Sequence, residues 1–158
     1  MLGQIIPNLW FDGQAEEAAT FYTEIFDGRI LAVTRAAAGS PVPEGQAVTV
    51  EWEMNGQHFV GINGGPGRPF TEALSLAVQC EDSAEVDRMW EALLAGGGEE
   101  SRCGWLKDRF GLSWQVVPAG LVQLLSDPDP GRAQRATEAM LSMRKLDIEQ
   151  IRAAADAG

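Results

Sequence analysis

Histidine and cysteine are scarce in this chain of 158 residues, which has one histidine and two cysteines. A single histidine, His58, argues against a His-based catalytic triad and against a metal centre built from several imidazoles. The cysteines, Cys80 and Cys103, have neither the spacing of a metal motif nor the number of a disulfide framework. Free thiols are typical of a reducing compartment, so we expect a cytoplasmic protein.

Basic residues and long apolar runs are also scarce. Lys and Arg number 12 against 23 Asp and Glu, so the net charge is -11. Polyanions repel such a chain, and we therefore expect neither nucleic acid nor a membrane as a partner. No apolar run approaches the roughly 20 residues that cross a bilayer, and we expect no signal peptide. The remaining composition, 45% hydrophobic, is that of a globular protein with one real core.

The clearest local signal is Asn55-Gly56, a two-residue turn of type I′ chemistry between two runs of β-forming residues. This turn sets a register that pairs Trp52 with Phe59 and Glu53 with His58. The apolar face of the hairpin is predicted to point inward, and His58 to form a surface pair on the other face. The two strands span 47–54 and 57–63, and the apolar face carries Val50, Trp52, Met54, Phe59 and Gly61.

The two halves of the chain resemble each other in the order of their predicted elements. Helices are predicted at 15–26 and 83–95, the second capped by Asp82 with Glu85 three places after it. Aligning the two helices matches Ala18 with Val86 and Ile25 with Leu93. Each half is therefore predicted to be one copy of a duplicated β-α-β-β-β module, and the expected fold class is α+β. Besides the hairpin, strands are expected at 4–11, 29–37, 73–80, 99–105 and 112–117, with the glycine-rich segment 64–70 as the connector.

The segment after Pro118 has a different character, because it alternates helical patterns with the break Ser126–Pro130. Helices are predicted at 119–125, 131–143 and 145–156, packed on the sheet or on a second subunit. We expect a domain at 1–118, made of modules at about 1–66 and 70–118, followed by a helical extension at 119–158.

Gln115 is the first candidate for a functional site. It lies in the middle of the predicted strand 112–117, where Ser113 and Val117 share its side and Trp114 lies on the other. An amide there costs free energy unless it finds hydrogen-bond partners or faces a wet cavity. Gln115 is therefore either a residue that lines a binding cavity or a structural partner within the sheet.

Cys103 has two interpretations. It is a reactive thiol if Arg102, Lys107 and Arg109 also lie close in space and lower the pKa of its thiol. Otherwise it is a small buried residue, which is the usual role of a free cysteine.

Several segments together resemble PhnB-like proteins, a branch of the glyoxalase/bleomycin-resistance/dioxygenase (vicinal oxygen chelate) superfamily. This branch is also labelled 3-demethylubiquinone-9 3-methyltransferase-like. The resemblance implies two β-α-β-β-β modules whose mixed sheets curl into a cup, in a homodimer. In metal-dependent members, the first and last strands of each module supply His, Gln or Glu ligands to one divalent metal. The segments are Ile6–Ala18 with Phe21-Tyr22, Asn55–Gln57, Asn63–Pro66, Trp105–Gln115 and Leu124–Pro130.

Carried onto this chain, the four ligand positions fall on weak or unsuitable donors. The opening strands offer Asn8 and Ser75, and the last strand offers Gln115 where a metal-dependent relative has Glu. The strand that closes the first module offers Phe59 or Gly61, and neither side chain binds metal. Neutral donors bind divalent metals weakly, so we expect no cofactor and no tightly bound metal, with a weakly bound one left open.

The ligand implied by the resemblance is a small organic molecule. Trp10, Trp52 and Trp105 either form an aromatic wall around it or belong to the core. Methyl transfer is disfavoured, because the sequence lacks a glycine-rich turn after the first strand of a doubly wound parallel sheet. The expected ligand-binding residues are Asn8, Trp10, Trp52, Phe59, Ser75, Trp105 and Gln115, with Cys103 as the catalytic candidate and no metal ligands.

Three functions remain open. The chain is a binding or sequestering protein, as bleomycin-resistance relatives are. Alternatively it is a superfamily enzyme of lyase, isomerase or dioxygenase type, which acts on a small carbonyl or enol substrate through Cys103, Gln115 or a weakly bound metal. As a third option it is an interaction protein that uses its C-terminal helices.

Overall fold

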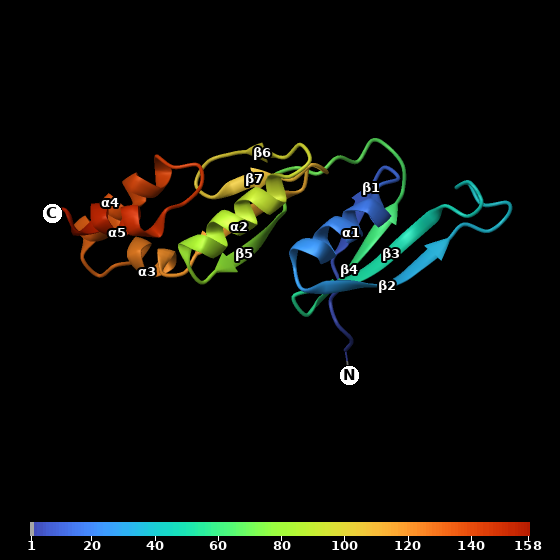
Figure 1. The fold of residues 1–158 in the computed structure, drawn as a ribbon, viewed down its shortest axis with the longest axis horizontal. Coiled ribbons are helices and arrows are strands. Elements are labelled where there is room, and N and C mark those ends of the chain that lie inside the picture. The colour runs from blue at the N-terminus through green and yellow to red at the C-terminus, as the bar shows by residue number, and fades with distance from the viewer. Residues whose placement is uncertain (1) are drawn as a thin grey trace. The chain divides into compact units, whose positions relative to one another are not determined.

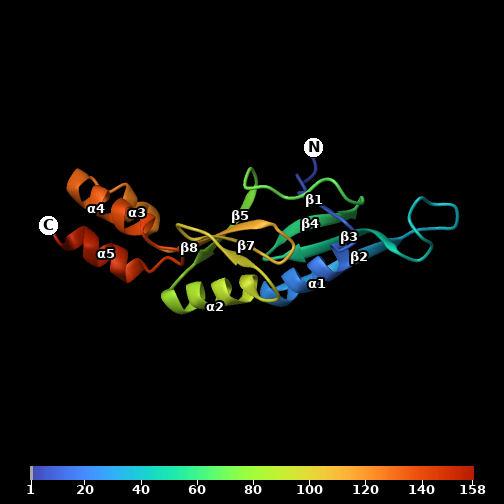
Figure 2. The same ribbon diagram turned by 90° about the horizontal axis from the view of Figure 1, so that it is seen from above.

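The computed structural model describes residues 2–158 and has the predicted α+β class. The chain divides into two compact units, one ending at Phe70 and the other spanning Thr71–Gly158. Each unit contains a four-stranded mixed sheet with a helix packed on one face (Figures 1 and 2). Within residues 2–158, no helix is long and apolar enough to cross a membrane.

The first unit is one β-α-β-β-β module. Its sheet has the order β1-β4-β3-β2, with β1 parallel to β4 and the other neighbours antiparallel. The predicted hairpin is confirmed, because Asn55 and Gly56 both adopt positive φ and Trp52 pairs with Phe59. The elements are β1 (Asn8–Phe11), α1 (Ala15–Ile25), β2 (Gly28–Arg35), β3 (Ala47–Met54) and β4 (Gln57–Asn63).

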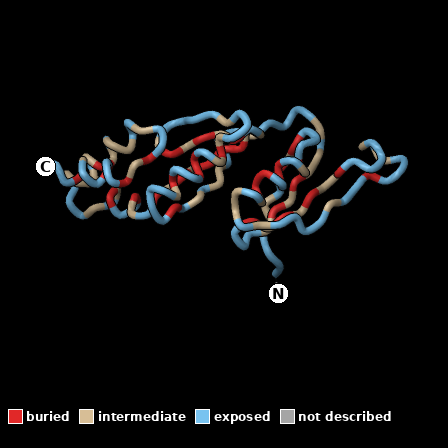
Figure 3. The backbone as a smooth tube through the Cα atoms, in the orientation of Figure 1, coloured by how far each residue is buried: buried red, intermediate tan, exposed pale blue. Residues whose placement is uncertain are grey.

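The core of the first unit lies between α1 and the apolar face of the hairpin (Figure 3). Trp52 is fully buried, stacks on Phe59 at 5.8 Å between ring centroids, and lies 6.1 Å from Tyr22 of α1. Gly61 allows α1 to approach, since a Cβ there would lie 3.0 Å from the Cβ of Ala15. The prediction that this face points inward is confirmed, and the helix is what covers it.

The second unit repeats the module, with sheet order β5-β8-β7-β6 and β5 parallel to β8. Asp82 caps its helix by accepting a hydrogen bond from the Glu85 backbone N–H, as the sequence predicted. Its elements are β5 (Ser75–Cys80), α2 (Ser83–Leu94), β6 (Glu99–Glu100), β7 (Trp105–Lys107) and β8 (Ser113–Pro118).

The predicted strand 99–105 is wrong. The chain leaves the sheet after Glu100 and re-enters it at Trp105, because Cys103 and Gly104 adopt positive φ values of 56° and 83°. Left-handed backbone cannot continue a strand, so these two residues make a turn between β6 and β7. The first strand also starts later than predicted, at Asn8 rather than Gln4.

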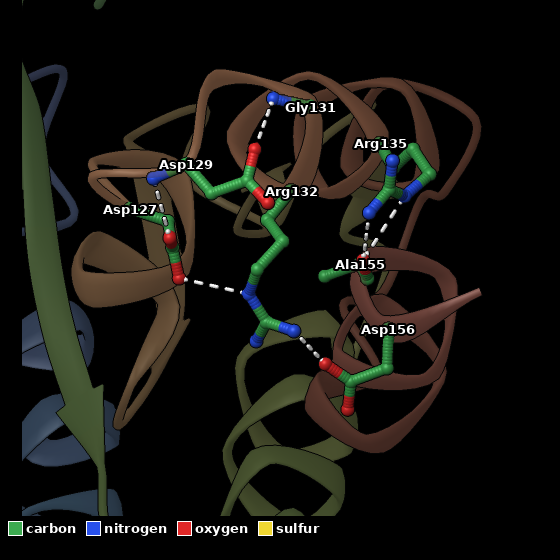
Figure 4. Close-up of polar contacts among 7 residues, drawn as sticks. All are labelled: Asp127, Asp129, Gly131, Arg132, Arg135, Ala155 and Asp156. Atoms are coloured by element: carbon green, nitrogen blue, oxygen red, sulfur yellow. Dashed lines mark hydrogen bonds and ion pairs between the residues drawn. The ribbon is translucent and has the colours of Figure 1, made fainter. Parts of the chain in front are cut away.

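Three C-terminal helices complete the second unit, close to their predicted bounds, with a hydrophobic cluster of their own that includes Ile151 and Ala136. Two arginines of the middle helix hold them together (Figure 4). Arg132 binds both Asp127 and Asp156, and Arg135 donates two hydrogen bonds to the Ala155 carbonyl. The helices are α3 (Leu121–Leu125), α4 (Pro130–Leu141) and α5 (Ile148–Asp156).

Candidate functional site

Three of the predicted site residues share one face of the second sheet. The other face of this sheet, which carries the buried Leu106, Trp114 and Val116, packs under α2. We call the opposite side its helix-free face, apart from its end at Val117, which packs against the C-terminal helices. Gln115 lies there directly across from Trp105, and its Nε2 donates a 2.9 Å hydrogen bond to Oγ of Ser75. An amide, a hydroxyl and an indole are thus brought together from three strands.

Ser113 belongs to the same face and was not among the predicted site residues. It pairs with Ser75 on one side and Lys107 on the other, and only 1% of its surface is exposed. Its hydroxyl has no hydrogen-bond partner among residues 2–158. A buried hydroxyl in this state costs about 1–3 kcal/mol, so it favours a site that a polar group of a ligand can complete.

A charged pair borders Ser113. Lys107 Nζ lies 2.6 Å from a Glu72 carboxylate oxygen. The hydrogen bond from Lys107 lowers the pKa of Glu72, and the same bond raises the pKa of Lys107. This side of the sheet is therefore polar but carries little net charge.

Asp108 holds the loop that leads into β8, a role that the sequence did not reveal. Its carboxylate is buried and accepts hydrogen bonds from the backbone N–H groups of Phe110 and Leu112 and from the indole N–H of Trp114, at 2.9–3.1 Å. These contacts fix the start of the strand that carries Gln115. A charged residue between Lys107 and Arg109 looked solvated in the sequence, so nothing local distinguished it.

Cys103 lies in the turn before Trp105 and is half-buried. Two of the basic residues expected to surround its thiol are engaged elsewhere. Lys107 pairs with Glu72, and the Arg109 guanidinium lies over the Phe110 ring at 5.0 Å from its centroid. The geometry therefore gives little support to an activated thiol.

Cys80 is the more inert of the two cysteines, and a thiol assay can show it. Burial raises the pKa of the Cys80 thiol to about 11, so little thiolate exists near pH 8. We expect Cys103→Gly to leave a folded protein, because glycine relieves the left-handed strain at φ 56°, by about 1 kcal/mol. This variant should react with Ellman's reagent only after denaturation. Rapid labelling of the native variant would contradict the burial of Cys80.

On the first sheet, the helix-free face carries Asn8 and Trp10, whereas Leu9 and Phe11 between them are buried under α1. The Trp10 indole donates to the Gly65 carbonyl at 2.9 Å, and the Arg68 guanidinium lies 4.7 Å from the ring centroid. Trp10 is thus partly covered by the connector.

The residues proposed for the closing strand of the first module need correction. Asn8 pairs with Val60, so Val60 and not Phe59 or Gly61 shares its face. Phe59 and Trp52 lie on the opposite face, in the core under α1, because they face the helix that covers it. Neither is placed to contact a ligand. Val60, like Phe59 and Gly61, offers no metal donor.

His58 forms a charged contact on the helix-free face of the first sheet. The predicted register is confirmed, and His58 lies on the side away from the apolar face, as predicted. Its Nε2 is 3.2 Å from Oε2 of Glu51, so the side-chain contact is with Glu51 and not with its cross-strand neighbour Glu53. The contact is within ion-pair distance, but its alignment is not that of a hydrogen bond.

A cavity of about 580 Å³ lies at the amino end of α1, apart from these residues. Two of its charged lining residues are paired with each other, because Arg35 binds both carboxylate oxygens of Glu16, a contact that raises the pKa of Arg35. Asn63, which also lines it, is occupied by the Ala15 N–H and the Ala47 carbonyl. None of the predicted site residues borders this cavity, so the helix-free faces remain the better candidates.

No group of three or more His, Cys, Asp or Glu side chains suited to a metal occurs within residues 2–158. The side chains at the four expected positions on the helix-free faces are Asn8, Val60, Ser75 and Gln115, and that of Val60 has no donor atom.

Comparisons with known proteins agree on the family and the fold. Residues 3–117 match the family model of 3-demethylubiquinone-9 3-methyltransferase. The PhnB protein of Bacillus cereus, named as such a methyltransferase, is 34% identical, with 74% of this chain and 100% of that chain covered and a TM-score of 0.67. Protein PA1353 of Pseudomonas aeruginosa is 22% identical over 74% and 98% of the two chains, with a TM-score of 0.61.

A more distant likeness shows the fold alone. The fosfomycin resistance protein FosX of Mesorhizobium loti is 14% identical over 79% of this chain and 98% of its own, with a TM-score of 0.56. The search of curated proteins found no match.

Proposed function

Because the chain belongs to the 3-demethylubiquinone-9 3-methyltransferase family, a PhnB-like branch of the glyoxalase superfamily, we propose that it binds a small organic molecule on its helix-free sheet surfaces. The binding surface of the second sheet is formed by Ser75, Trp105 and Gln115. Asn8 and Trp10 are the corresponding candidates on the first sheet.

The observation that carries this proposal is the buried Ser113 hydroxyl beside the Gln115–Ser75 hydrogen bond. The Ser113 hydroxyl is buried without a partner among residues 2–158, and the indole of Trp105, across from Gln115, offers an apolar surface on the same face. A few convergent polar groups next to an aromatic ring are typical of sites for small ligands.

We also propose that binding occurs without a tightly bound metal. The side chains at the expected ligand positions are an aliphatic group, a hydroxyl and two amides, which are poor donors for a divalent cation. The methyl transfer in the family name gains no support from the fold, because residues 2–158 form two mixed sheets rather than one doubly wound parallel sheet.

The second candidate function is that of a superfamily enzyme acting on a small carbonyl or enol substrate. The proximity of His58 and Glu51 favours it, because an imidazole and a carboxylate together on one sheet surface are side chains that serve as general acids and bases. Such a base would abstract a proton next to a carbonyl group. Turnover lost in His58→Gln but retained in Cys103→Gly would identify this pair as the acid–base group.

The binding proposal is tested by a thermal-shift screen of small carbonyl and enol compounds, followed by calorimetry on the hits. We expect Gln115→Ala to weaken binding about tenfold, because it removes a hydrogen-bonding amide worth about 1–1.5 kcal/mol. Gln134→Ala is the matched control, since Gln134 is exposed on α4, away from the sheet. Equal affinities for the two variants would refute the site.

A separate measurement tests the proposal that no metal is tightly bound. Elemental analysis of protein purified without chelators should find no stoichiometric metal in the wild type. A stoichiometric metal that disappears in Gln115→Ala would overturn the metal-free proposal and point to Lewis-acid chemistry.

A further inference from the structure

The C-terminal helices lie beyond the part of the chain that defines the family. The family model ends at residue 117, and the Bacillus cereus structure is covered completely by only 74% of this chain. Helices α3, α4 and α5 nevertheless form a well-packed cluster in which Ala136, Ile151 and Ala155 are fully buried. An element of this kind needs a role that the module alone does not supply.

The segment that joins α4 to α5 is bound to the turn before Trp105. The backbone N–H groups of Cys103 and Gly104 donate to the carbonyls of Met143 and Arg144, at 2.9 and 2.7 Å. Leu146 is buried against the same turn, since a Cβ on Gly104 would lie 2.9 Å from its Cδ1. The turn is thus bonded to the joining segment on one side, while the Gly104 carbonyl accepts from the Val116 N–H of β8 on the other.

Ion pairs hold the joining segment to the rest of the module. Lys145 binds Asp87 of α2, and Arg144 lies 3.5 Å from Glu100 of β6. Glu100 also accepts the indole N–H of Trp90, a bond that lowers the pKa of its carboxyl group. The segment therefore contacts α2, β6 and the turn together, and the helices on either side of it are fixed to each other by Arg132 and Arg135 (Figure 4).

We propose that this joining segment, residues 142–147, is a positioning element for Trp105 in the ligand site. Cys103 is held in a left-handed conformation, which a non-glycine residue adopts only when its surroundings enforce it. The hydrogen bonds from the backbone N–H groups of Cys103 and Gly104 to the carbonyls of Met143 and Arg144 hold the turn in this conformation. They set the point at which the chain enters β7, and hence the placement of Trp105 across from Gln115. The part of this inference that concerns the ligand rests on the proposed binding function.

The test replaces Leu146, which is buried, with alanine, and uses Leu141→Ala as the control because Leu141 is exposed on α4. The first readout is the rate at which Cys103 reacts with Ellman's reagent in the native protein. We expect a rise of about tenfold or more for Leu146→Ala, because the turn opens more often, and no change for Leu141→Ala. Lys145→Ala is a milder second variant in case Leu146→Ala fails to fold, and a smaller rise is expected for it.

The second readout is the indole N–H resonance of Trp105, assigned by comparison with Trp105→Phe. It should shift in Leu146→Ala and in Lys145→Ala but not in Leu141→Ala. Unchanged Cys103 reactivity and an unchanged Trp105 resonance in both variants would overturn the inference.

The ligand readout separates this inference from the proposed function. If the screen yields a ligand that depends on Gln115, its affinity should fall in Leu146→Ala. Retained affinity despite a shifted Trp105 resonance would overturn the role of the segment in binding. If no compound binds the wild type, the proposed function fails, while the Cys103 and Trp105 readouts still decide whether the segment positions the turn.

Discussion

Replacing Asp108 with alanine is expected to destabilise the second unit by about 3–5 kcal/mol, enough to unfold many domains of this size. The change removes a buried carboxylate that accepts three hydrogen bonds, from Phe110, Leu112 and Trp114. Two of these bonds are themselves buried, so water cannot replace the lost acceptor without further opening. Urea denaturation followed by far-UV circular dichroism measures the loss.

Two other substitutions isolate the cause. Asp87→Ala removes an exposed aspartate that forms an ion pair in the same unit, and it should cost at most about 1 kcal/mol. Asp108→Asn keeps one carbonyl acceptor but cannot accept at both oxygen positions, so its cost should be intermediate. If Asp108→Ala and Asp87→Ala unfold at the same urea concentration, the loop does not depend on this carboxylate.

The consequence for function follows from the position of the loop. Asp108 fixes the residues that precede β8, and Gln115 lies on that strand. We therefore interpret Asp108 as a residue that acts on the site only by holding the strand in place. The Trp105–Gln115 segment, which carried much of the resemblance to the family, therefore contains both the Asp108 carboxylate that holds the strand and residues of the site itself.

The sequence predicted the modules well because their signals are local. The Asn55-Gly56 turn set the register of a whole hairpin, and the cap at Asp82 marked the start of α2. The break between β6 and β7 was not foreseen, because Cys103 adopts its positive φ through bonds to Met143 and Arg144, far along the chain. Interactions of that range leave no periodic trace in the sequence.

The candidate site was predicted less evenly, for a different physical reason. Alternation shows which side chains share a face, but not whether a helix or a ligand covers that face. Gln115 was a candidate because it interrupts an apolar strand, whereas Ser75 came from the resemblance to the family, and the two side chains are hydrogen-bonded. Trp52 was named among the expected ligand-binding residues, although α1 covers the apolar face on which it lies. His58 was expected on the other face of the hairpin, and it lies there.

The second large effect on stability is expected at Trp52, because this residue lies in the core of the first unit. Trp52→Ala should cost about 3–5 kcal/mol in the stability of the first unit, since the indole is fully buried between Phe59 and Tyr22. Trp105→Ala is the matched control, with the same chemical change at a half-buried position of the second sheet. Its cost should be less than half as large, while its effect on ligand affinity should be the greater.

Trp52→Phe sharpens the distinction between core and site. The Trp52 indole N–H is buried without a hydrogen-bond partner among residues 2–158, a cost of about 1–3 kcal/mol that phenylalanine removes. The smaller ring also leaves a cavity, so the two effects offset each other and the net change should stay within about 1.5 kcal/mol. Ligand binding should be unaffected. Loss of binding in Trp52→Phe at unchanged stability would place Trp52 in the site after all, and would mean that the apolar face opens from under α1 when the ligand binds.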